Sequence, residues 1–421
     1  MKKIVLSLIL FITSAMCSKA SNTNFTTCYI DIGHQPAVIY QPIDKTEKAN
    51  IAIVVMHSHE DYLNFTANTE LVKRGYTVIA TLPGSVDVME NKLLKIKACI
   101  DYLHDRGDIR KIILLGHSGG ATTMTAYQYL AENGREGLEG KLYQDYSDNI
   151  DHLPKADGIL LLDANPGLST VMLNSLDPNI TDESAGNGVN PTYNESDEKA
   201  YMKAQQQRYS RLTAYATERL AKIKAGKGRY TDDEPMVIPG SNSIRPFNRL
   251  YSSDIRLLSH TKEKWPLIHA DGSITKEIIH SVRAPFNPIN ATDKMSAAQN
   301  ITVRSYLSCY AMTVDDDYEI TEDGFKGIHF DSNLTSPIGN IQGIHVPSLF
   351  IGMTGSYEYI STESIFENSP AKDKSIAFVE GAGHNFFADK KAEAFNHANY
   401  GDTVKTLFDY VDKWISADNR F

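Results

Sequence analysis

The chain has 421 residues, of which 42% are hydrophobic and 22% are charged, so it is long enough to bury a large core. Its formal net charge of −10 includes no basic block, which argues against nucleic acid and anionic membrane surfaces as partners. This balance predicts a globular protein that acts on small or neutral substrates.

The N-terminal segment has the pattern of a secretory signal. Two lysines precede an apolar run at residues 4–12, which is too short to span a bilayer as a mature helix. Small residues favour cleavage after Ala20, whereas cleavage before Cys17 would leave a lipidated cysteine that tethers the protein to a membrane. We therefore predict a signal peptide at residues 1–20 and an exported protein of bacterial type, whether periplasmic, secreted or anchored as a lipoprotein.

Residues 24–163 alternate between short apolar runs and amphipathic helical patterns. Strands are expected at residues 37–40, 51–56, 77–80, 111–115 and 158–162, and helices at residues 65–73, 90–104 and 121–131. Alternation at this spacing implies parallel strand pairing through right-handed crossovers. This segment is therefore predicted to form the first part of an α/β core.

The alternation stops between residues 164 and 344. This stretch contains a polar helical pattern at residues 198–224 and loops rich in Pro, Gly and Asn, and it is too long to be a loop. We predict an inserted cap, mainly helical and loop. Strand and helix patterns return near residue 347, so residues 345–421 are predicted to be the second part of the core.

A turn rich in glycine follows the predicted strand at residues 111–115. Residues 116–120 read Gly-His-Ser-Gly-Gly and lead directly into a predicted helix. Glycines on both sides allow a sharp turn that exposes the Oγ atom of Ser118, and the N–H of Gly119 is left near the helix start to meet a developing oxyanion. This pattern predicts a nucleophile elbow with Ser118 as the nucleophile.

The order of these elements resembles the α/β-hydrolase family, with the elbow after the fifth strand and an insertion after the sixth. The resemblance is carried by residues 71–80, 116–120 and 379–387, and the core segments cover a little over half of the chain. It implies a mostly parallel central sheet flanked by helices, and a catalytic triad in the chain order nucleophile, acid, histidine.

The resemblance also implies roles for the remaining triad residues. His384, in a glycine-rich loop after the last strand, takes the place of the general base that accepts the Ser118 proton. The acid is expected after the seventh strand, where Glu358 is the carboxylate within reach. Some relatives carry the acid after the sixth strand, where this chain has Asp163, so we prefer Glu358 and keep Asp163 as the alternative.

The second oxyanion donor is expected in the loop after the third strand. Relatives usually carry His-Gly there, whereas this chain has His57-Ser58-His59, and by position His59 would offer its backbone N–H. Ser58 in place of glycine is a departure that puts the usual turn of this loop in question.

The same loop supports a rival interpretation as a metal site. The spacing His57-x-His59-x-Asp61 resembles the motif of metallo-β-lactamase-like hydrolases, and three further ligand types follow at His117, Asp163 and His384. Tyr62 stands where that motif has another histidine, and the elbow belongs to the other fold. We therefore favour the serine hydrolase, with no metal and no other cofactor.

The cysteines after the signal segment are Cys28, Cys99 and Cys309, which form no C-x-x-C pair and no dense framework. Cys99 shares a helical face with apolar residues and is predicted to be a buried thiol. A bridge between Cys28 and Cys309 is left open as an option in an oxidising compartment.

Together these patterns predict an exported serine hydrolase that cleaves a small-molecule carboxylic ester through an acyl-enzyme. An amidase or peptidase is the nearest alternative, because the triad alone does not separate esters from amides. A surface binding protein that keeps the fold without activity is an alternative of a different class.

Overall fold

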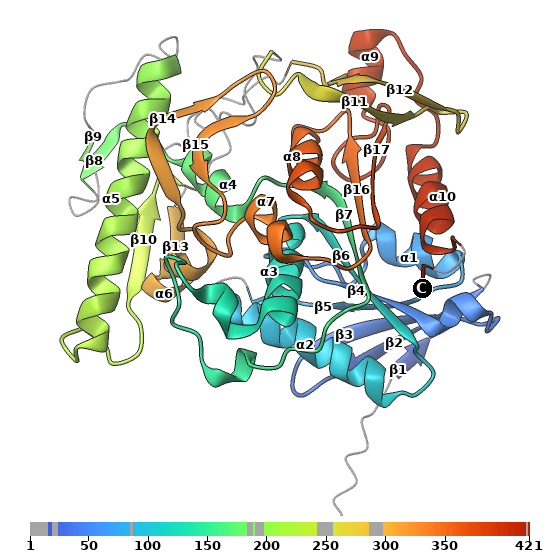
Figure 1. Cartoon of the computed structure of the whole chain (residues 1–421), viewed down its shortest axis with the longest axis horizontal. Coiled ribbons are helices and arrows are strands. Elements are labelled where there is room, and N and C mark those ends of the chain that lie inside the picture. The colour runs from blue at the N-terminus through green and yellow to red at the C-terminus, as the bar shows by residue number, and fades with distance from the viewer. Residues whose placement is uncertain are drawn as a thin grey trace, which may run out of the picture.

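The computed structural model describes residues 16–18, 24–84, 87–182, 188–189, 198–241, 256–285, 298–417 and 420–421. The described chain is built around an 11-stranded sheet (Figure 1). In chain order its strands are β1 (Met16–Ser18), β2 (Phe25–Asp31), β3 (Pro36–Pro42), β4 (Ile51–Val55), β5 (Thr77–Thr81), β6 (Lys111–Ser118), β7 (Gly158–Ala164), β11 (His260–Ile268), β12 (Ile274–His280), β16 (Ser348–Met353) and β17 (Lys374–Val379).

The strands lie in the order β1-β2-β3-β5-β4-β6-β7-β16-β17-β11-β12. All neighbours from β5 to β11 are parallel, whereas β1, β2, β3 and β12 pair antiparallel at the two edges. The central strands carry continuous apolar runs and are buried along their length, as expected where both faces of a parallel sheet are covered. The predicted mostly parallel sheet is confirmed.

Helices cover both faces of the sheet, and alternate strand residues pack against opposite layers. In β6, Ile112 and Leu114 pack with α2 (Met89–Asp105), α3 (Gly120–Asn133) and α8 (Ile360–Asn368), whereas Ile113 and Leu115 pack with α1 (Thr66–Lys73) and α10 (Thr403–Ile415). This alternation follows from the two-residue period of a strand. The sheet is thus the middle of three layers, with the elbow at the carboxyl end of β6.

The predicted insertion at residues 164–344 has structure of its own. Figure 1 shows most of its described part to one side of the central sheet. It contains the helices α4 (Leu168–Ser175), α5 (Glu198–Lys224), α6 (Val303–Cys309) and α7 (Pro337–Asn340), and three strand pairs: β8 (Ile180–Asp182) with β9 (Gly188–Val189), β10 (Pro235–Pro239) with β13 (Ala298–Thr302), and β14 (Thr313–Ile320) with β15 (Phe325–His329). It therefore contains more strand than the expected helices and loops.

Two segments depart from the predicted boundaries. The hairpin β11–β12 lies within the predicted insertion but extends the central sheet, since Leu267 and Ile268 pair in parallel with β17. Its sequence carries no signal of a buried strand because few residues of the hairpin are buried. At the other edge, β1 falls inside the predicted signal peptide and pairs with β2, where Cys17 stands opposite Cys28.

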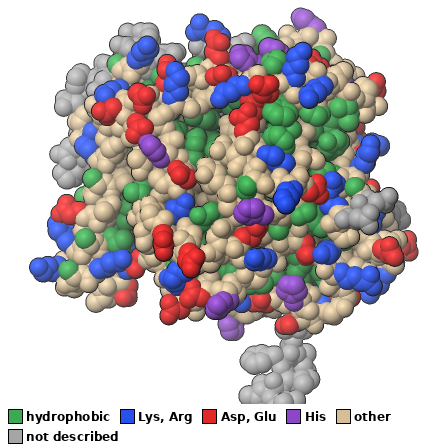
Figure 2. Space-filling view, viewed as in Figure 1, with side chains coloured by type: hydrophobic (Ala, Val, Ile, Leu, Met, Phe, Trp, Pro, Cys, Tyr) green, Lys and Arg blue, Asp and Glu red, His purple; other side chains and the backbone are tan. Residues whose placement is uncertain are grey.

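The remaining described elements are α9 (Lys390–Asn396) and the 3-10 helices η1 (Glu47–Asn50), η2 (Gly134–Leu138), η3 (Asp148–Ile150) and η5 (Ile341–Gly343). Among the helices that the structure describes, none is both long and apolar enough to cross a membrane. Acidic and basic side chains are interspersed over the face shown in Figure 2.

The cysteines settle one question that the sequence left open and confirm one prediction. Cys28 is disulfide-bonded, whereas Cys99 and Cys309 are free and buried. The bridge between Cys28 and Cys309 that the sequence left open is therefore not formed, since Cys309 keeps a free thiol beside Ser308. The prediction of Cys99 as a buried thiol is confirmed.

Candidate active site

The turn between β6 and α3 places Ser118 at the carboxyl end of the sheet. Ser118 is partly exposed and has φ of 52°, in the left-handed region that a residue with a side chain adopts only at a cost. A Cβ atom on Gly116 would lie 2.6 Å from the Cα atom of Ala121, so the turn requires glycine there. The sequence 116–120 thus folds into the sharp strand-to-helix turn that was expected.

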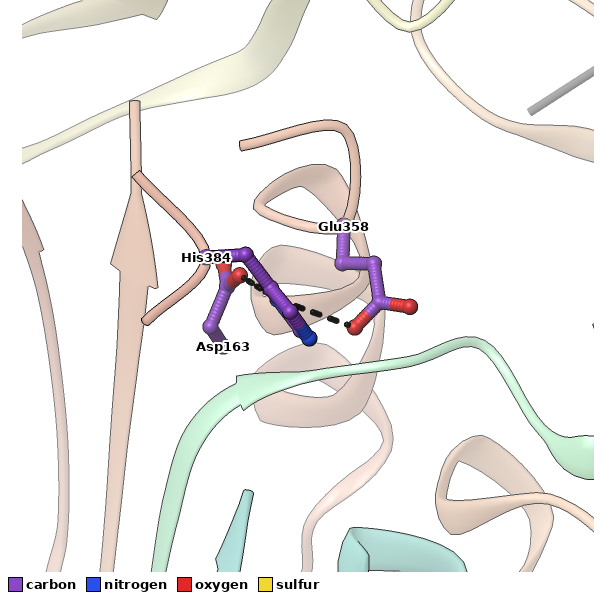
Figure 3. Close-up of side chains that lie close together, drawn as sticks. All are labelled: Asp163, Glu358 and His384. Atoms are coloured by element: carbon purple, nitrogen blue, oxygen red, sulfur yellow. Dashed lines mark hydrogen bonds and ion pairs between the residues drawn. The ribbon is translucent and has the colours of Figure 1, made fainter. Parts of the chain in front are cut away.

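His384 lies in the loop that follows β17, and its ring meets a buried carboxylate. The Nδ1 atom of His384 is 2.7 Å from Oδ2 of Asp163 (Figure 3). Asp163 is fully buried near the end of β7, where its φ of 46° marks a tight turn, and its Oδ1 accepts a hydrogen bond from the N–H of Met353 at 3.2 Å. Both oxygens of Asp163 are therefore engaged, one of them by the imidazole.

Glu358, the preferred acid from the sequence, approaches the same imidazole without hydrogen bonding to it. Its Oε2 atom lies 3.6 Å from Nδ1 of His384 and accepts no hydrogen bond, although the side chain is buried. Figure 3 shows both carboxylates beside the ring of His384. Of the two carboxylates, Asp163 rather than the preferred Glu358 therefore lies within hydrogen-bonding distance of the imidazole.

The two buried carboxylates shift the protonation of the group. Burial raises the pKa of the Glu358 carboxyl to about 8, although the positive charge of His384 opposes the shift. The negative charge of Asp163 adds to it, and hydrogen bonds with Tyr357 and Ser118 reduce it. Burial alone would lower the pKa of His384, but the charge of Glu358 and the hydrogen bond and charge of Asp163 raise it to about 9. The site therefore favours the imidazolium form.

The loop after β4 touches the elbow through Ser58. A Cβ atom on Gly119 would lie 2.3 Å from Oγ of Ser58, so the serine that replaces the usual glycine fits because residue 119 is glycine. The N–H of His59, the predicted oxyanion donor, donates to Nδ1 of His57 at 3.2 Å. The same Nδ1 accepts the N–H of Glu60 at 2.8 Å. The expected donor is therefore near the site but is engaged within its own loop.

His117 ties the elbow to the loop of His384, a role that its sequence context did not reveal. Its Nε2 atom lies 2.7 Å from the backbone carbonyl of His384, and its Nδ1 atom lies 2.7 Å from the hydroxyl of Tyr62. A carbonyl only accepts, so Nε2 carries the proton and Nδ1 accepts from Tyr62. Burial holds the pKa of His117 well below its usual value, which keeps the ring neutral. No local pattern signals this contact, because it joins residues 267 positions apart.

Among the described residues, the rival set of metal ligands is brought together only in part, at Asp163 and His384. The ring of His59 contacts the hydroxyls of Ser58 and Tyr310, and the rings of His57 and His117 are engaged as described above. Among the residues that the structure describes, the cluster of His, Cys, Asp and Glu side chains close enough to share an ion comprises Asp163, Glu358 and His384, and it includes none of the loop residues 57–61. The histidine rings of this loop contact protein groups instead.

No protein-family model and no curated protein matches this sequence. Among solved structures, it is similar to Est1E from Butyrivibrio proteoclasticus, with 10% identity, a TM-score of 0.41, and coverage of 93% of this chain and 99% of that one. The esterase domain of a Rhodothermus marinus protein gives 10% identity, a TM-score of 0.40, and coverage of 93% and 99%. A soluble variant of monoglyceride lipase from Saccharomyces cerevisiae gives 9% identity, a TM-score of 0.41, and coverage of 99% and 98%. Structural similarity at these identities and TM-scores carries no argument about activity.

The strand order, the elbow after β6 and the flanking helices give this chain an α/β-hydrolase fold, an assignment that rests on its own topology.

Proposed function

We propose that this protein is an exported serine hydrolase that cleaves carboxylic esters through an acyl-enzyme. One observation carries the proposal: Ser118 is held at a strained, partly exposed turn, in the same site as an imidazole that is hydrogen-bonded to a buried carboxylate. A nucleophile, a base and an orienting acid at the carboxyl ends of strands of one sheet are the parts that acyl transfer needs.

In this mechanism Oγ of Ser118 attacks the ester carbonyl while Nε2 of His384 accepts its proton. His384 then returns that proton to the leaving alcohol, and a water molecule, activated in the same way, releases the carboxylic acid. Asp163, rather than Glu358, orients the imidazole, because it is the carboxylate within hydrogen-bonding distance of Nδ1. The N–H of Gly119 stabilises the oxyanion.

The N–H of His59 is proposed as the second oxyanion donor. Its present bond to Nδ1 of His57 is long, at 3.2 Å, and that nitrogen already accepts the N–H of Glu60 at 2.8 Å. If the N–H of His59 donates to an oxyanion instead, Nδ1 of His57 therefore keeps the N–H of Glu60 as its donor. Burial lowers the pKa of His57 to about 3, so its ring stays neutral and Nδ1 keeps its lone pair.

Export is part of the proposal and rests on the pattern of residues 1–20.

A fluorophosphonate probe tests the proposal directly. The folded protein is expected to incorporate one probe molecule, at Ser118, as mapped by peptide mass spectrometry, and heat-unfolded protein is expected to incorporate none. Matched p-nitrophenyl esters and anilides then separate an esterase from an amidase, and turnover is expected to be insensitive to chelators. A folded protein that takes up no probe would instead indicate a binding protein that keeps only the fold.

The pH dependence of turnover is expected to reflect the raised pKa of His384. The base acts only when neutral, so a raised pKa means that activity is lost at higher pH as the solution is acidified. We expect the acid limb of kcat/KM to have its midpoint above about pH 7, rather than at the 6 to 7 of an unperturbed histidine. Replacement of Glu358 by Gln removes the charge that contributes most to raising this pKa, so the midpoint is expected to move toward acid.

Glu380→Gln is the matched control for that shift. Glu380 also pairs with a histidine, at 2.7 Å from Nδ1 of His269, but it lies outside the site. Its replacement is expected to leave the profile unchanged. An acid limb that is the same in wild type and Glu358→Gln would show that Glu358 does not act on the base.

A further inference from the structure

Lys92 is a buried cation beneath the loop that follows β4. It lies in the first turn of α2 and is 1% exposed, which places it among the largest fully buried side chains of the described chain. Its Nζ atom donates to the backbone carbonyls of Ser58 and Gly84, each at 2.7 Å. Both acceptors are neutral carbonyl groups, so the hydrogen bonds of the buried ammonium go to two peptide dipoles rather than to water or a carboxylate. Burial lowers the pKa of Lys92, although the nearby Cys309 and Asp87 oppose the shift.

The bond to Ser58 sets the orientation of the next peptide group. A trans peptide is planar, with its C=O and N–H pointing in opposite directions. Because Lys92 holds the carbonyl of Ser58, the N–H of His59 must point away from Lys92. Ser58 itself lies against Gly119, as its Oγ atom occupies the place of a Cβ at that residue. The peptide that Lys92 orients is therefore the part of the loop that adjoins the elbow.

The positive charge of Lys92 also acts on the two histidines of this loop. After burial, its charge is the cause that lowers the pKa of His59, and it also lowers the pKa of His57, behind burial and the charges of His59 and His384. A fixed positive charge behind a peptide dipole strengthens the dipole as a donor to a developing negative charge.

We propose that Lys92 is a positioning residue of the oxyanion hole: it orients the Ser58–His59 peptide so that the N–H of His59 faces the oxyanion, and its ammonium strengthens that donor. This inference rests on the proposed function, since it needs an oxyanion at Ser118. It explains why a lysine is buried on α2 with backbone carbonyls as its hydrogen-bond acceptors.

The test compares Lys92→Met, which keeps the length and removes the donor and charge, with Lys97→Met. Lys97 lies on the same helix and pairs at the surface with Asp101, so it serves as a matched control. The measurements are kcat and KM for p-nitrophenyl acetate, the rate of phosphonylation by a fluorophosphonate, and the affinity for an aryl boronic acid that forms a tetrahedral anion on Ser118.

We expect Lys92→Met to lower kcat by about 10- to 100-fold, with KM changed by less than about twofold, because the lost contact acts on the transition state. Phosphonylation and boronic acid binding are expected to weaken by a similar factor, and Lys97→Met is expected to match wild type. A folded Lys92→Met protein with wild-type kcat, or with its loss confined to KM, would overturn the inference.

A second variant covers the case in which Lys92→Met does not fold. Lys92→Gln keeps a hydrogen-bond donor but has no charge, and it is expected to lose kcat by about 5-fold or more while KM holds. Wild-type kcat in this variant would overturn the role of the charge. If wild type itself takes up no fluorophosphonate, the proposed function is wrong. If wild type is labelled and Lys92→Met keeps the kcat of wild type, only the inference about Lys92 is wrong.

Discussion

Ser118→Ala is expected to lower ester turnover by about 10⁴- to 10⁶-fold, because the triad acts as a unit and loses its nucleophile. The residual rate comes from the oxyanion hole and from substrate binding. The side chain is partly exposed at a turn, so the variant is expected to keep the wild-type circular dichroism spectrum. Steady-state kinetics with an aryl ester measure the loss, and retained activity would rule out Ser118 as the nucleophile.

A glycine at the same position separates loss of chemistry from loss of structure. Ser118 has φ of 52°, which costs an alanine about as much as the serine but costs glycine little. Ser118→Gly is therefore expected to be as inactive as Ser118→Ala, yet more stable by about 1 kcal/mol in urea unfolding. Equal stability of the two variants would show that the turn stores no strain.

Asp163→Asn is expected to lower kcat by about 10³- to 10⁴-fold, because an amide no longer holds the His384 ring in the tautomer that accepts a proton at Nε2. Asn keeps the size of the side chain and tolerates the φ of 46° at this residue, so the melting temperature is expected to change little. This prediction rests on the hydrogen bond of 2.7 Å between Oδ2 of Asp163 and Nδ1 of His384.

Glu358→Gln is the matched comparison, since Glu358 faces the same nitrogen at 3.6 Å. It is expected to lose less than about tenfold in kcat when each variant is measured at its own pH optimum. The opposite ranking, with Glu358→Gln nearly inactive and Asp163→Asn nearly normal, would restore the acid that the sequence favoured and leave Ser118 and His384 in their proposed roles.

The sequence by itself determined the core and its turn. Apolar runs such as residues 111–115 predict buried parallel strands because both faces of such a strand are covered, and the observed β6 carries that run. Glycine at position 116 predicts the sharp turn because a Cβ atom would collide there. These are local properties, since each depends on the side chains of one short segment and on the backbone conformations open to it.

Only the tertiary structure decided which carboxylate meets His384 and that Lys92 is buried against the carbonyl of Ser58. Asp163 and Glu358 both follow strands in the sequence, and their order of preference depends on a turn that brings one of them 0.9 Å closer to Nδ1. The hairpin β11–β12 joins the sheet through the pairing of Leu267 and Ile268 with β17, and so short an apolar run does not by itself predict a strand of the core. In each case the deciding contact joins residues far apart in the chain, and a distance of that kind is set by the packing of whole elements.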